Sequence, residues 1–338
     1  MPQPRRVTLL DVARHAGVSR TTASFVLTGR RDMRISVDAE QRVLRAAREL
    51  SYRPNLMARS LRTRTTQTIG LISDTLATEP FAGEVVRGSV ATALRLEHLL
   101  FIGETEGDPA VEERLVQDML DRGVDGFLYA AMFTRKAKPP AALRGHPHVL
   151  VNCLSRDRKT TAVLPDEHGA GRSAAEVLLT AGHRAGIHLV GVAEPTVYAA
   201  AQRLAGIEEA LREAGVRLAG RVDCDWWPER AYAAVHAFLG RGGRPGALIC
   251  LNDRIAFGAY QALQEAGLRV PQDVSVVSFD DSDLAGWLRP ALTSVALPHA
   301  ELGRRAVELL LDDKRPEGAV TVPMPVHARD SIAPPAAG

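Results

Sequence analysis

Residues 8–27 read TLLDVARHAGVSRTTASFVL, two short segments of apolar spacing on either side of a single glycine. Thr8 followed by Asp11 is typical of a helix start, where the first residue caps the helix and the acid three positions on caps it in return. Gly17 can adopt the positive φ that ends a helix, and Ser19 is a good N-cap for the next one. The stretch therefore predicts two helices joined by a tight turn, which is the helix-turn-helix pattern.

Two helices of about two turns each are marginal alone, so the pattern needs a further element to bury its apolar face. Residues 36–50 predict that element, a third helix with Val43, Leu44, Ala47 and Leu50 at helical spacing. We expect the three helices to share a small core, to which the first two contribute Leu9, Val12, Ala13, Ala16, Val18, Ala23, Val26 and Leu27.

The outward side of the second helix then carries a polar set with one aromatic residue: Arg20, Thr21, Thr22, Ser24 and Phe25. In helix-turn-helix proteins, the N-terminal residues of the second helix contact base edges in the major groove.

The charge of the chain is unevenly distributed. Residues 1–64 hold 14 arginines, no lysine and five acids, a formal charge of +9, whereas the remainder carries −7. A basic face that only meets solvent is the alternative, but this density of charge favours contact with a polyanion. With the helix-turn-helix pattern, it predicts double-stranded DNA as a partner of residues 1–53.

Residues 54–66 link this head to the rest of the chain. Within them, residues 55–62 are basic and helix-compatible, with Met57 and Leu61 four positions apart. Such a helix could fold on contact with DNA and insert an apolar side chain between base steps of the minor groove. A plain interdomain linker fits the same residues, and the residues alone leave both interpretations open.

The stretches TLLDVARHAGVSRTTASFVL, SVDAEQRVLRAARELSYRPN and NLMARSLRTRTTQTIGLI resemble the DNA-binding head and hinge of the LacI (lac repressor) family. The resemblance implies base reading by Arg20, Thr21 and Phe25. It implies backbone or supporting contacts for Thr8, Ser19, Thr22, Ser24 and Ser36. In the hinge helix, which opens near Asn55, it implies that Leu61 is the minor-groove wedge, with Ala58 beside it.

The chain departs from the family pattern at the reading helix. Phe25 stands where a polar residue is frequent, and it can meet thymine methyl groups but cannot hydrogen-bond a base. The loop TGRRDMRIS also looks about two residues longer than usual, carrying Arg30, Arg31 and Arg34. The operator sequence therefore cannot be inferred from a relative.

From Thr68 onward, apolar strands alternate with helices, which predicts parallel sheets covered by helices. The expected strands are 68–73, 99–103, 126–132, 148–152, 185–191, 247–253 and 274–281. The expected helices are 83–97, 109–122, 167–181, 199–214, 229–240, 254–266 and 299–312.

The strand–helix series repeats in outline, so we predict a two-lobed core over residues 67–338. Lobe one spans about 67–163 plus 297–328, and lobe two spans about 164–296. The resemblance supports this, because the body looks like the periplasmic-binding-protein-like core of the same family. Two lobes joined in this way can hinge around a ligand.

Ligands of open α/β lobes bind outside the carboxyl ends of the strands. The residues there are Ser73, Asp74, Asn152, Asn252, Asp253, Asp280 and Asp281, joined by Arg203 and the pair Trp226–Trp227. Carboxylates, amides, one arginine and flat indoles suit a polyhydroxylated ligand, so we expect a sugar or sugar derivative as effector. A strand-end Asp or Asn can also cap the next helix, which stays open for Asp253 and Asp281.

The resemblance implies effector contacts for Phe81, Asn152, Arg203, Trp226, Asn252 and Asp280. Asp74, at the end of its strand, completes the expected effector-binding set. Leu297 stands where relatives often place a glutamine, which removes one polar contact. Trp227 and Trp287 fit packing or interface positions equally well.

Features of other functional classes are missing. The sequence contains no phosphate-binding loop, nucleophile elbow, zinc-protease motif or C-x-x-C pair. Its histidines lack metal-ligand spacing, and we expect no catalytic residue, metal or cofactor. Asp280, Asp281 and Asp283 could bind a hard cation, but hydrogen-bond acceptors and caps are favoured.

Three distant cysteines, Cys153, Cys224 and Cys250, fit neither a disulfide framework nor a zinc cluster. No apolar run is long enough for a membrane span, and MPQPRR is followed by no secretory apolar region. We therefore expect a cytoplasmic protein, and the absence of a C-terminal leucine heptad favours a homodimer over a tetramer.

The sequence thus predicts a transcriptional regulator, a repressor, whose binding to a pseudo-palindromic operator is controlled by the effector. A solute-binding receptor of the same body fold is the first alternative, opposed by the basic head. A sugar-metabolising enzyme such as a kinase is the second, opposed by the missing phosphate-binding loop.

Overall fold

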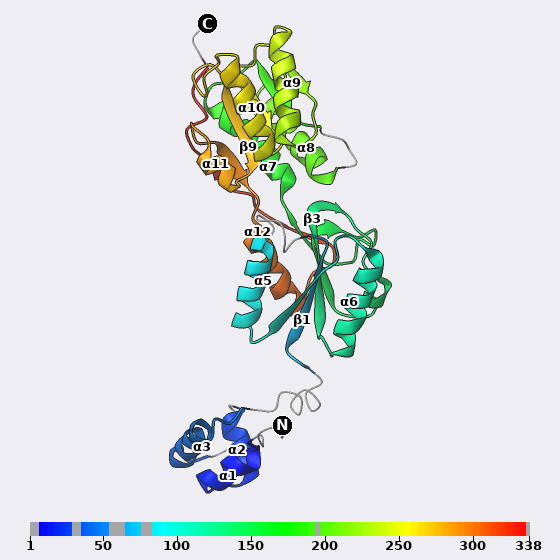
Figure 1. Ribbon diagram of the computed structural model, residues 1–338, viewed down its shortest axis with the longest axis vertical. Helices are drawn as coiled ribbons and strands as arrows, with labels where there is room; N and C mark the ends of the chain where they lie inside the picture. Colours follow the sequence, from blue (N-terminus) through cyan, green and yellow to red (C-terminus); the bar gives the residue numbers. More distant parts are fainter. Residues whose placement is uncertain (1–6, 29–34, 54–64, 76–82, 193–196, 336–338) are drawn as a thin grey trace. The chain divides into compact units, whose positions relative to one another are not determined.

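The computed structural model describes residues 7–28, 35–53, 65–75, 83–192 and 197–335 (Figure 1). The chain divides into two compact units, residues 1–66 and residues 67–338. The smaller unit is helical where it is described, and the larger unit is built on two sheets.

Three helices form the described part of the smaller unit: α1 (Leu9–Ala16), α2 (Arg20–Leu27) and α3 (Val37–Glu49). Gly17 ends α1 with a φ of +64°, and the amide of Val18 donates to the carbonyl of Ala13 at 3.0 Å. This left-handed cap suits glycine, which has no Cβ to clash with the preceding turn. The turn lets the three helices share a core of Val12, Ala13, Ala16, Ala23, Val43 and Ala46.

One predicted core residue of this unit is wrong. Leu44 is 42% exposed, and Ala46 is buried beside Val43 instead. Val43 and Ala46 are three positions apart and share a face of α3. Leu44 follows Val43 directly, so its side chain is rotated by about 100° from that face. The apolar residue at position 44 therefore points to solvent although its spacing looks regular.

The first sheet of the larger unit has the strand order β11-β5-β4-β3-β1-β2, and all of its pairs are parallel. Its strands are β1 (Thr68–Ser73), β2 (Leu99–Glu104), β3 (Gly126–Lys136), β4 (His148–Leu154), β5 (Ala162–Pro165) and β11 (Ala319–Val322).

Helices cover both faces of this sheet (Figure 1). On one face, α5 (Gly83–Arg95) packs against α12 (His299–Leu310), and both contribute to one apolar cluster with the strands. On the other face, α6 (Pro109–Asp121) and the short 3₁₀ helix η1 (Ala141–Leu143) close a second cluster. A parallel sheet buried on both faces is what the continuous apolar strands predict.

The second sheet has the order β12-β10-β9-β8-β6-β7, parallel except for the β10–β12 pair. Its strands are β6 (Ile187–Val190), β7 (Gly220–Val222), β8 (Ala247–Cys250), β9 (Ser275–Asp280), β10 (Thr293–Ala296) and β12 (Val326–His327). Its helices are α7 (Glu167–Thr180), α8 (Tyr198–Glu213), α9 (Pro228–Gly240), α10 (Asp253–Glu265) and α11 (Asp283–Trp287).

The predicted α/β core with two lobes and parallel sheets is confirmed. The predicted lobe limits differ from the sheets at two places. Strand β5 (Ala162–Pro165) lies wholly in the first sheet, beyond residue 163, and β12 (Val326–His327) pairs in the second sheet. The chain therefore crosses between the lobes three times: after β5, after β10 and after β11.

Among the described helices, none is long and apolar enough to cross a lipid bilayer.

Candidate DNA-binding face and effector pocket

The second helix of the smaller unit is capped by Ser19, whose Oγ accepts the amide of Thr22 at 3.0 Å. The same hydroxyl lies 2.8 Å from Oγ1 of Thr22. Arg20 and Thr21 are exposed at the N-terminal end of α2, whereas Ala23 is fully buried in the core. The end of the helix that enters a groove in helix-turn-helix proteins is thus accessible.

The other predicted positions on α2 are half-buried. Thr22, Ser24 and Phe25 lie between the exposed ridge and the core. Ser24 also accepts the hydroxyl of Thr28 on its carbonyl at 2.7 Å, which tightens the last turn of the helix. Arg20 and Thr21 are therefore the most accessible of the five predicted residues.

Thr8 and Ser36 act as N-caps in the structure. Thr8 Oγ1 accepts the amide of Asp11 at 3.3 Å, and the amide of Thr8 donates to Asp11 Oδ2 at 2.8 Å. Ser36 Oγ accepts the amide of Ala39 at 3.3 Å. These hydroxyls hold the starts of α1 and α3. The backbone or supporting DNA contacts that the resemblance implies for Thr8 and Ser36 stay a prediction.

Some predicted residues lie outside the part of the chain that the structure describes: Asn55, Ala58, Leu61 and Phe81.

The carboxyl ends of both sheets contribute to a pocket of about 290 Å³ in the larger unit. From lobe one it is lined by Met132, Phe133, Thr134 and Asn152. From lobe two and the crossing segment it is lined by Glu167, Val197, Ala199, Arg203, Trp226, Asn252, Arg254, Asp280, Ser282, Leu297 and His299. The site between strand ends that the topology predicts is therefore present.

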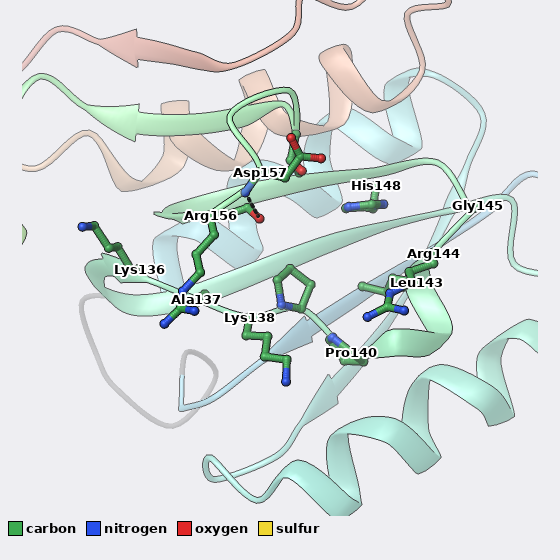
Figure 2. Close-up of a pocket in the computed structure, with 13 residues that line it drawn as sticks. Lys136, Ala137, Lys138, Pro140, Leu143, Arg144, Gly145, His148, Arg156 and Asp157 are labelled. Carbon is green, nitrogen blue, oxygen red and sulfur yellow. Dashed lines mark hydrogen bonds between the residues drawn. The ribbon is translucent and has the colours of Figure 1, made fainter.

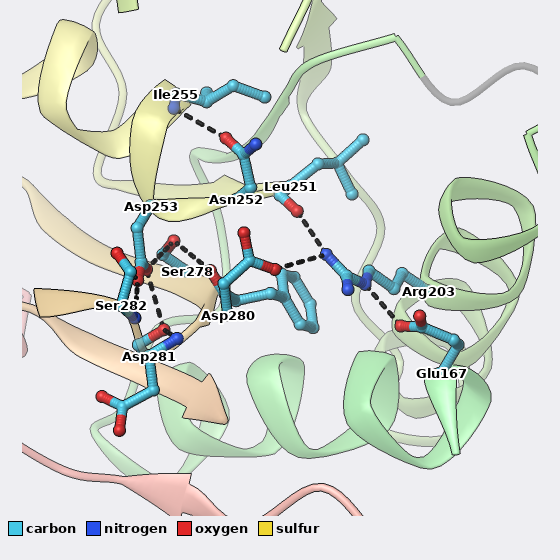
Figure 3. Close-up of polar contacts among 12 residues, drawn as sticks. Glu167, Arg203, Leu251, Asn252, Asp253, Ile255, Ser278, Asp280, Asp281 and Ser282 are labelled. Atoms are coloured by element: carbon cyan, nitrogen blue, oxygen red, sulfur yellow. Dashed lines mark hydrogen bonds and ion pairs between the residues drawn. The ribbon is translucent and has the colours of Figure 1, made fainter. Parts of the chain in front are cut away.

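Arg203 is the centre of the polar network in this pocket, and only 2% of it is exposed (Figure 3). Its Nε donates to Glu167 Oε2 at 2.6 Å, and its Nη1 donates to the carbonyl of Leu251 at 2.5 Å. Asp280 Oδ1 lies 3.6 Å from the same Nη1. The Glu167 carboxylate and the Leu251 carbonyl thus compensate the buried guanidinium, as a buried charge requires.

Close helix packing brings Arg203 to Glu167. A Cβ added to Gly171 of α7 would lie 2.0 Å from the carbonyl oxygen of Arg203. A Cβ at Gly206 of α8 would lie 2.0 Å from the carbonyl of His168. The two glycines therefore let the helix backbones approach closely enough for the side-chain pair to form.

The guanidinium of Arg203 also lies over aromatic rings, 4.6 Å from the centroid of Phe279 and 5.7 Å from that of Trp226. The indole nitrogen of Trp226 donates to the carbonyl of Val192 at 3.1 Å, which fixes the ring. Trp226 therefore offers a flat apolar face of set orientation to the pocket.

Asp280 and Asn252 supply further polar atoms. Burial raises the pKa of the Asp280 carboxyl to about 8, although the Arg203 cation opposes the shift. Asp280 has a φ of +100°, which is unusual for any residue except glycine. Such strained backbone conformations cluster at functional sites. Asn252 caps α10 by accepting the amide of Ile255 at 2.8 Å, so its Nδ2 remains for the pocket.

The buried carboxylate of Asp253 secures the end of β9, where Asp280 lies (Figure 3). It accepts the hydroxyls of Ser278 at 2.7 Å, Ser294 at 2.8 Å and Ser282 at 2.9 Å. It also accepts the amide of Ser282 at 2.7 Å. Four hydrogen bonds occupy both oxygens of the carboxylate and leave no acceptor for a ligand. Of the two roles considered for Asp253, ligand contact and structural support, the structure favours structural support.

Asn152 lines the pocket, but its amide is already engaged. Its Nδ2 donates to the carbonyls of Ala131 at 3.1 Å and Met132 at 3.0 Å, and its Oδ1 accepts the hydroxyl of Thr134. Its φ of +55° lies within β4, between Val151 and Cys153, where the register with β3 shifts. Asn152 therefore shapes the lobe-one wall more than it offers free polar atoms.

Asp74 is not brought to this pocket. Its Oδ1 accepts the amides of Thr75 and Met132, both at 2.9 Å, and its Oδ2 accepts Arg135 Nη2 at 3.1 Å. A carboxylate with these partners holds the ends of β1 and β3 together. The prediction that it contacts the effector has no support from its position.

The sequence did not single out two buried polar residues of the pocket. Glu167 is 3% exposed and begins α7 after the four-residue strand β5, so no strand-end signal preceded it. His299 begins α12, and its Nδ1 is buried without a hydrogen-bond partner among the described residues. Burial and the nearby Arg203 cation lower the pKa of His299 to about 4, so its imidazole is neutral near pH 7.

Among the described residues, no group of three or more His, Cys, Asp or Glu side chains is arranged to hold a metal ion.

Two family models match the sequence: bacterial regulatory proteins, lacI family, over residues 8–55, and the periplasmic binding protein-like domain over residues 175–332. A ribose operon repressor of Haemophilus influenzae is 35% identical over 306 residues, covering 90% of this chain and 91% of the repressor.

Solved structures agree with these matches. The Lac repressor dimer bound to operator and an anti-inducer covers 97% of this chain and 100% of its own, with 25% identity and a TM-score of 0.74. A LacI-family regulator from Enterococcus faecium with bound ribose covers 79% of this chain and 99% of its own, with 26% identity and a TM-score of 0.63.

Proposed function

Because this chain belongs to the LacI family of bacterial regulatory proteins, and is an effector-controlled DNA-binding regulator, we propose that it is a repressor controlled by a neutral sugar. As a homodimer it binds a pseudo-palindromic operator through two copies of α2 (Arg20–Leu27). The sugar binds in the pocket between the lobes and changes the affinity of the protein for the operator.

The observation that carries the effector proposal is the convergence of Arg203, Asp280 and Asn252 around the fixed ring of Trp226. A guanidinium, a carboxyl group and an amide match the hydroxyls of a sugar as donors and acceptors. The indole covers the apolar face of a sugar ring. This is the pattern of a mostly apolar pocket with a few placed polar groups.

The size and charge of the pocket narrow the ligand further. A volume of about 290 Å³ is near the lower end of the roughly 300–1,000 Å³ common for ligand pockets, which favours a monosaccharide. Two acids, Glu167 and Asp280, face two cations, Arg203 and Arg254. Because Glu167 already pairs with the buried Arg203 at 2.6 Å, that cation is not available to a phosphate group, which favours an uncharged ligand over a phosphorylated one.

Ribose is the first ligand to test, because a repressor named for the ribose operon and a ribose-bound regulator are both similar to this chain. We also propose that the protein acts by binding and not by catalysis. An assay of ATP turnover in the presence of each bound sugar should show none.

The test is a thermal-shift screen of the full chain with ribose and other monosaccharides, followed by calorimetry and by gel shift with the adjoining intergenic DNA. We expect a bound sugar to lose roughly tenfold or more of its affinity in Trp226→Ala, since a buried aromatic contact contributes over 1 kcal/mol. Trp227→Ala is the matched control, because Trp227 is 53% exposed and does not line the pocket.

Equal losses in Trp226→Ala and Trp227→Ala would place the sugar elsewhere. A sugar that binds tightly without changing operator affinity would contradict its role as effector.

A further inference from the structure

A second, larger pocket of about 830 Å³ lies within lobe one, between the segment that follows β3 and the loop that joins β4 to β5 (Figure 2). Four cationic side chains line it: Lys136, Lys138, Arg144 and Arg156. They come from the end of β3, the segment after it, the end of η1 and the β4–β5 loop. None of these residues lines the pocket between the lobes.

Within the described part of the chain, the four cations have no acidic partner. Most other arginines of this lobe do: Arg87 pairs with Glu84, Arg95 with Glu308, and Arg135 with Asp74. By contrast, none of Lys136, Lys138, Arg144 and Arg156 forms an ion pair with any residue that the structure describes. Unpaired cations that gather on one concave surface create a positive potential there.

Two of the few lysines of the chain line this same pocket in lobe one. The chain has four lysines among its 42 basic residues: Lys136, Lys138, Lys159 and Lys314. Two of them line this pocket, and Lys159 follows in the β4–β5 loop. Residues 65–338 carry a net formal charge of −7, so the local excess of positive charge is not a property of the whole unit.

The floor of the pocket is made of buried apolar residues, and one acidic residue is among the residues that line it. Ala137, Pro140 and Leu143 are buried beneath the cations, and Pro139 stiffens the same segment. Asp157 is the acid, and its Oδ1 accepts the amide of Lys159 at 3.0 Å. Ser155 and Thr160 line the same loop. In Figure 2, Lys136 and Arg144 lie at opposite ends of the group, with Arg156 and Lys138 between them.

From this arrangement we propose that the lobe-one pocket binds a small polyanion carrying phosphate groups, at a site separate from the effector pocket. Separated cations suit a ligand with more than one charged group, and the arginine fork and the lysine ammonium are the side chains that bind phosphate. The buried apolar floor and the concave shape of the pocket fit a small molecule better than a flat macromolecular surface.

The pocket is also connected to the effector pocket through one strand. Phe133 and Thr134 of β3 line the pocket between the lobes, and Lys136 at the end of the same strand lines the cationic pocket. Arg135 between them is held by Asp74. A polyanion bound at Lys136 therefore acts on the strand that forms the lobe-one wall of the effector pocket.

The test uses pyrophosphate as probe and the full chain, titrated by calorimetry at constant ionic strength. We expect saturable binding that weakens at least tenfold in the double variant Lys138→Gln/Arg144→Gln. The matched control is Arg217→Gln/Arg241→Gln, which removes two exposed cations of lobe two and should leave the affinity unchanged. Because all four positions are exposed, unfolding curves should show that both variants fold.

Two further variants test whether the charge of the lobe-one pocket matters and whether its ligand binds independently of the effector pocket. Lys138→Arg should retain binding within a few-fold, and Asp280→Asn should leave pyrophosphate affinity intact, since the site does not depend on the proposed effector. Equal affinity in the pocket variant and the unchanged chain would overturn the proposal, because the basic head would then be the binding site. A pocket variant that binds pyrophosphate normally but loses affinity for non-specific DNA would also overturn it, in favour of a nucleic-acid contact.

Discussion

Arg20 is the most accessible charged side chain at the start of the recognition helix α2, and it lies on a unit separate from the effector pocket. We predict that Arg20→Ala weakens binding to the specific operator by roughly tenfold or more, since one good base contact contributes about 1–3 kcal/mol. Sugar affinity, measured by calorimetry, should not change. Simultaneous loss of both activities would contradict the modular organisation.

Asp280 makes the stability of the protein depend on pH. Its pKa of about 8 in the folded state exceeds the ordinary value of about 3.9. The folded protein thus keeps a proton that the unfolded chain has released, so the free energy of unfolding falls as pH rises from about 4 to about 8 and then levels off. His299 acts in the opposite direction and mainly below pH 6.5, because there the unfolded chain takes up a proton that the folded imidazole, with a pKa of about 4, does not.

We therefore predict that Asp280→Asn flattens the decline in stability between pH 6.5 and 8, as measured by urea unfolding at several pH values. The exposed Asp313→Asn should keep the slope of the unchanged protein. Parallel slopes for Asp280→Asn and the unchanged protein would show that Asp280 is ionised at pH 6.5.

The contact between α7 and α8 is the element on which the effector pocket depends. Because a Cβ at Gly171 would lie 2.0 Å from the carbonyl of Arg203, Gly171→Ala forces the two helices apart. We predict a loss of about 2 kcal/mol in the free energy of unfolding, typical of overpacking, with weaker sugar binding. Denaturant unfolding and calorimetry measure the two effects.

Gly240→Ala at the end of α9 is the matched control for that substitution, since a Cβ there meets no atom within 4 Å. It should leave both stability and sugar binding close to those of the unchanged protein. A neutral Gly171→Ala would show that the helices can separate without disturbing the pair of Arg203 and Glu167.

Long helices were predictable from the sequence, and so were the four-residue strands β6 and β8, which lie in longer apolar runs, whereas other short strands were not. Helices such as α3 (Val37–Glu49) and α10 (Asp253–Glu265) follow from apolar periodicity and caps. Strands β5, β7, β10 and β12 have four residues or fewer, too few for a pattern to emerge from their surroundings. Their existence is decided by pairing with distant strands, which only the tertiary fold reveals.

The candidate site was predictable to a similar extent. Asn252 and Asp280 follow recognisable strands, so their place at the sheet edge could be inferred. Glu167 could not, because its strand β5 was missed, and Asp74 was misplaced because its bonds to Met132 and Arg135 are long-range. Polar residues at strand ends look alike in sequence, and only the hydrogen-bond network separates ligand contacts from structural ones.

The separation of charge within the whole molecule predicts how its two binding activities respond to salt. Operator binding should weaken roughly a thousandfold between 50 and 200 mM salt if six or more phosphates are contacted, because counterions are released. Binding of a neutral sugar should hardly change. Fluorescence anisotropy with operator DNA and calorimetry with sugar give the two slopes, and a salt-insensitive operator affinity would contradict phosphate contacts by the basic head.

The three crossings between lobes also determine the order in which the chain can fold during synthesis. Helix α12 and strand β11 complete lobe one, and β12 then forms the edge of the second sheet, all from residues 299–327. Strand β5 pairs with β11 from more than 150 residues away, so lobe one stays open while lobe two emerges from the ribosome. The apolar face of α5 that α12 covers therefore has no partner helix until the last segments are made.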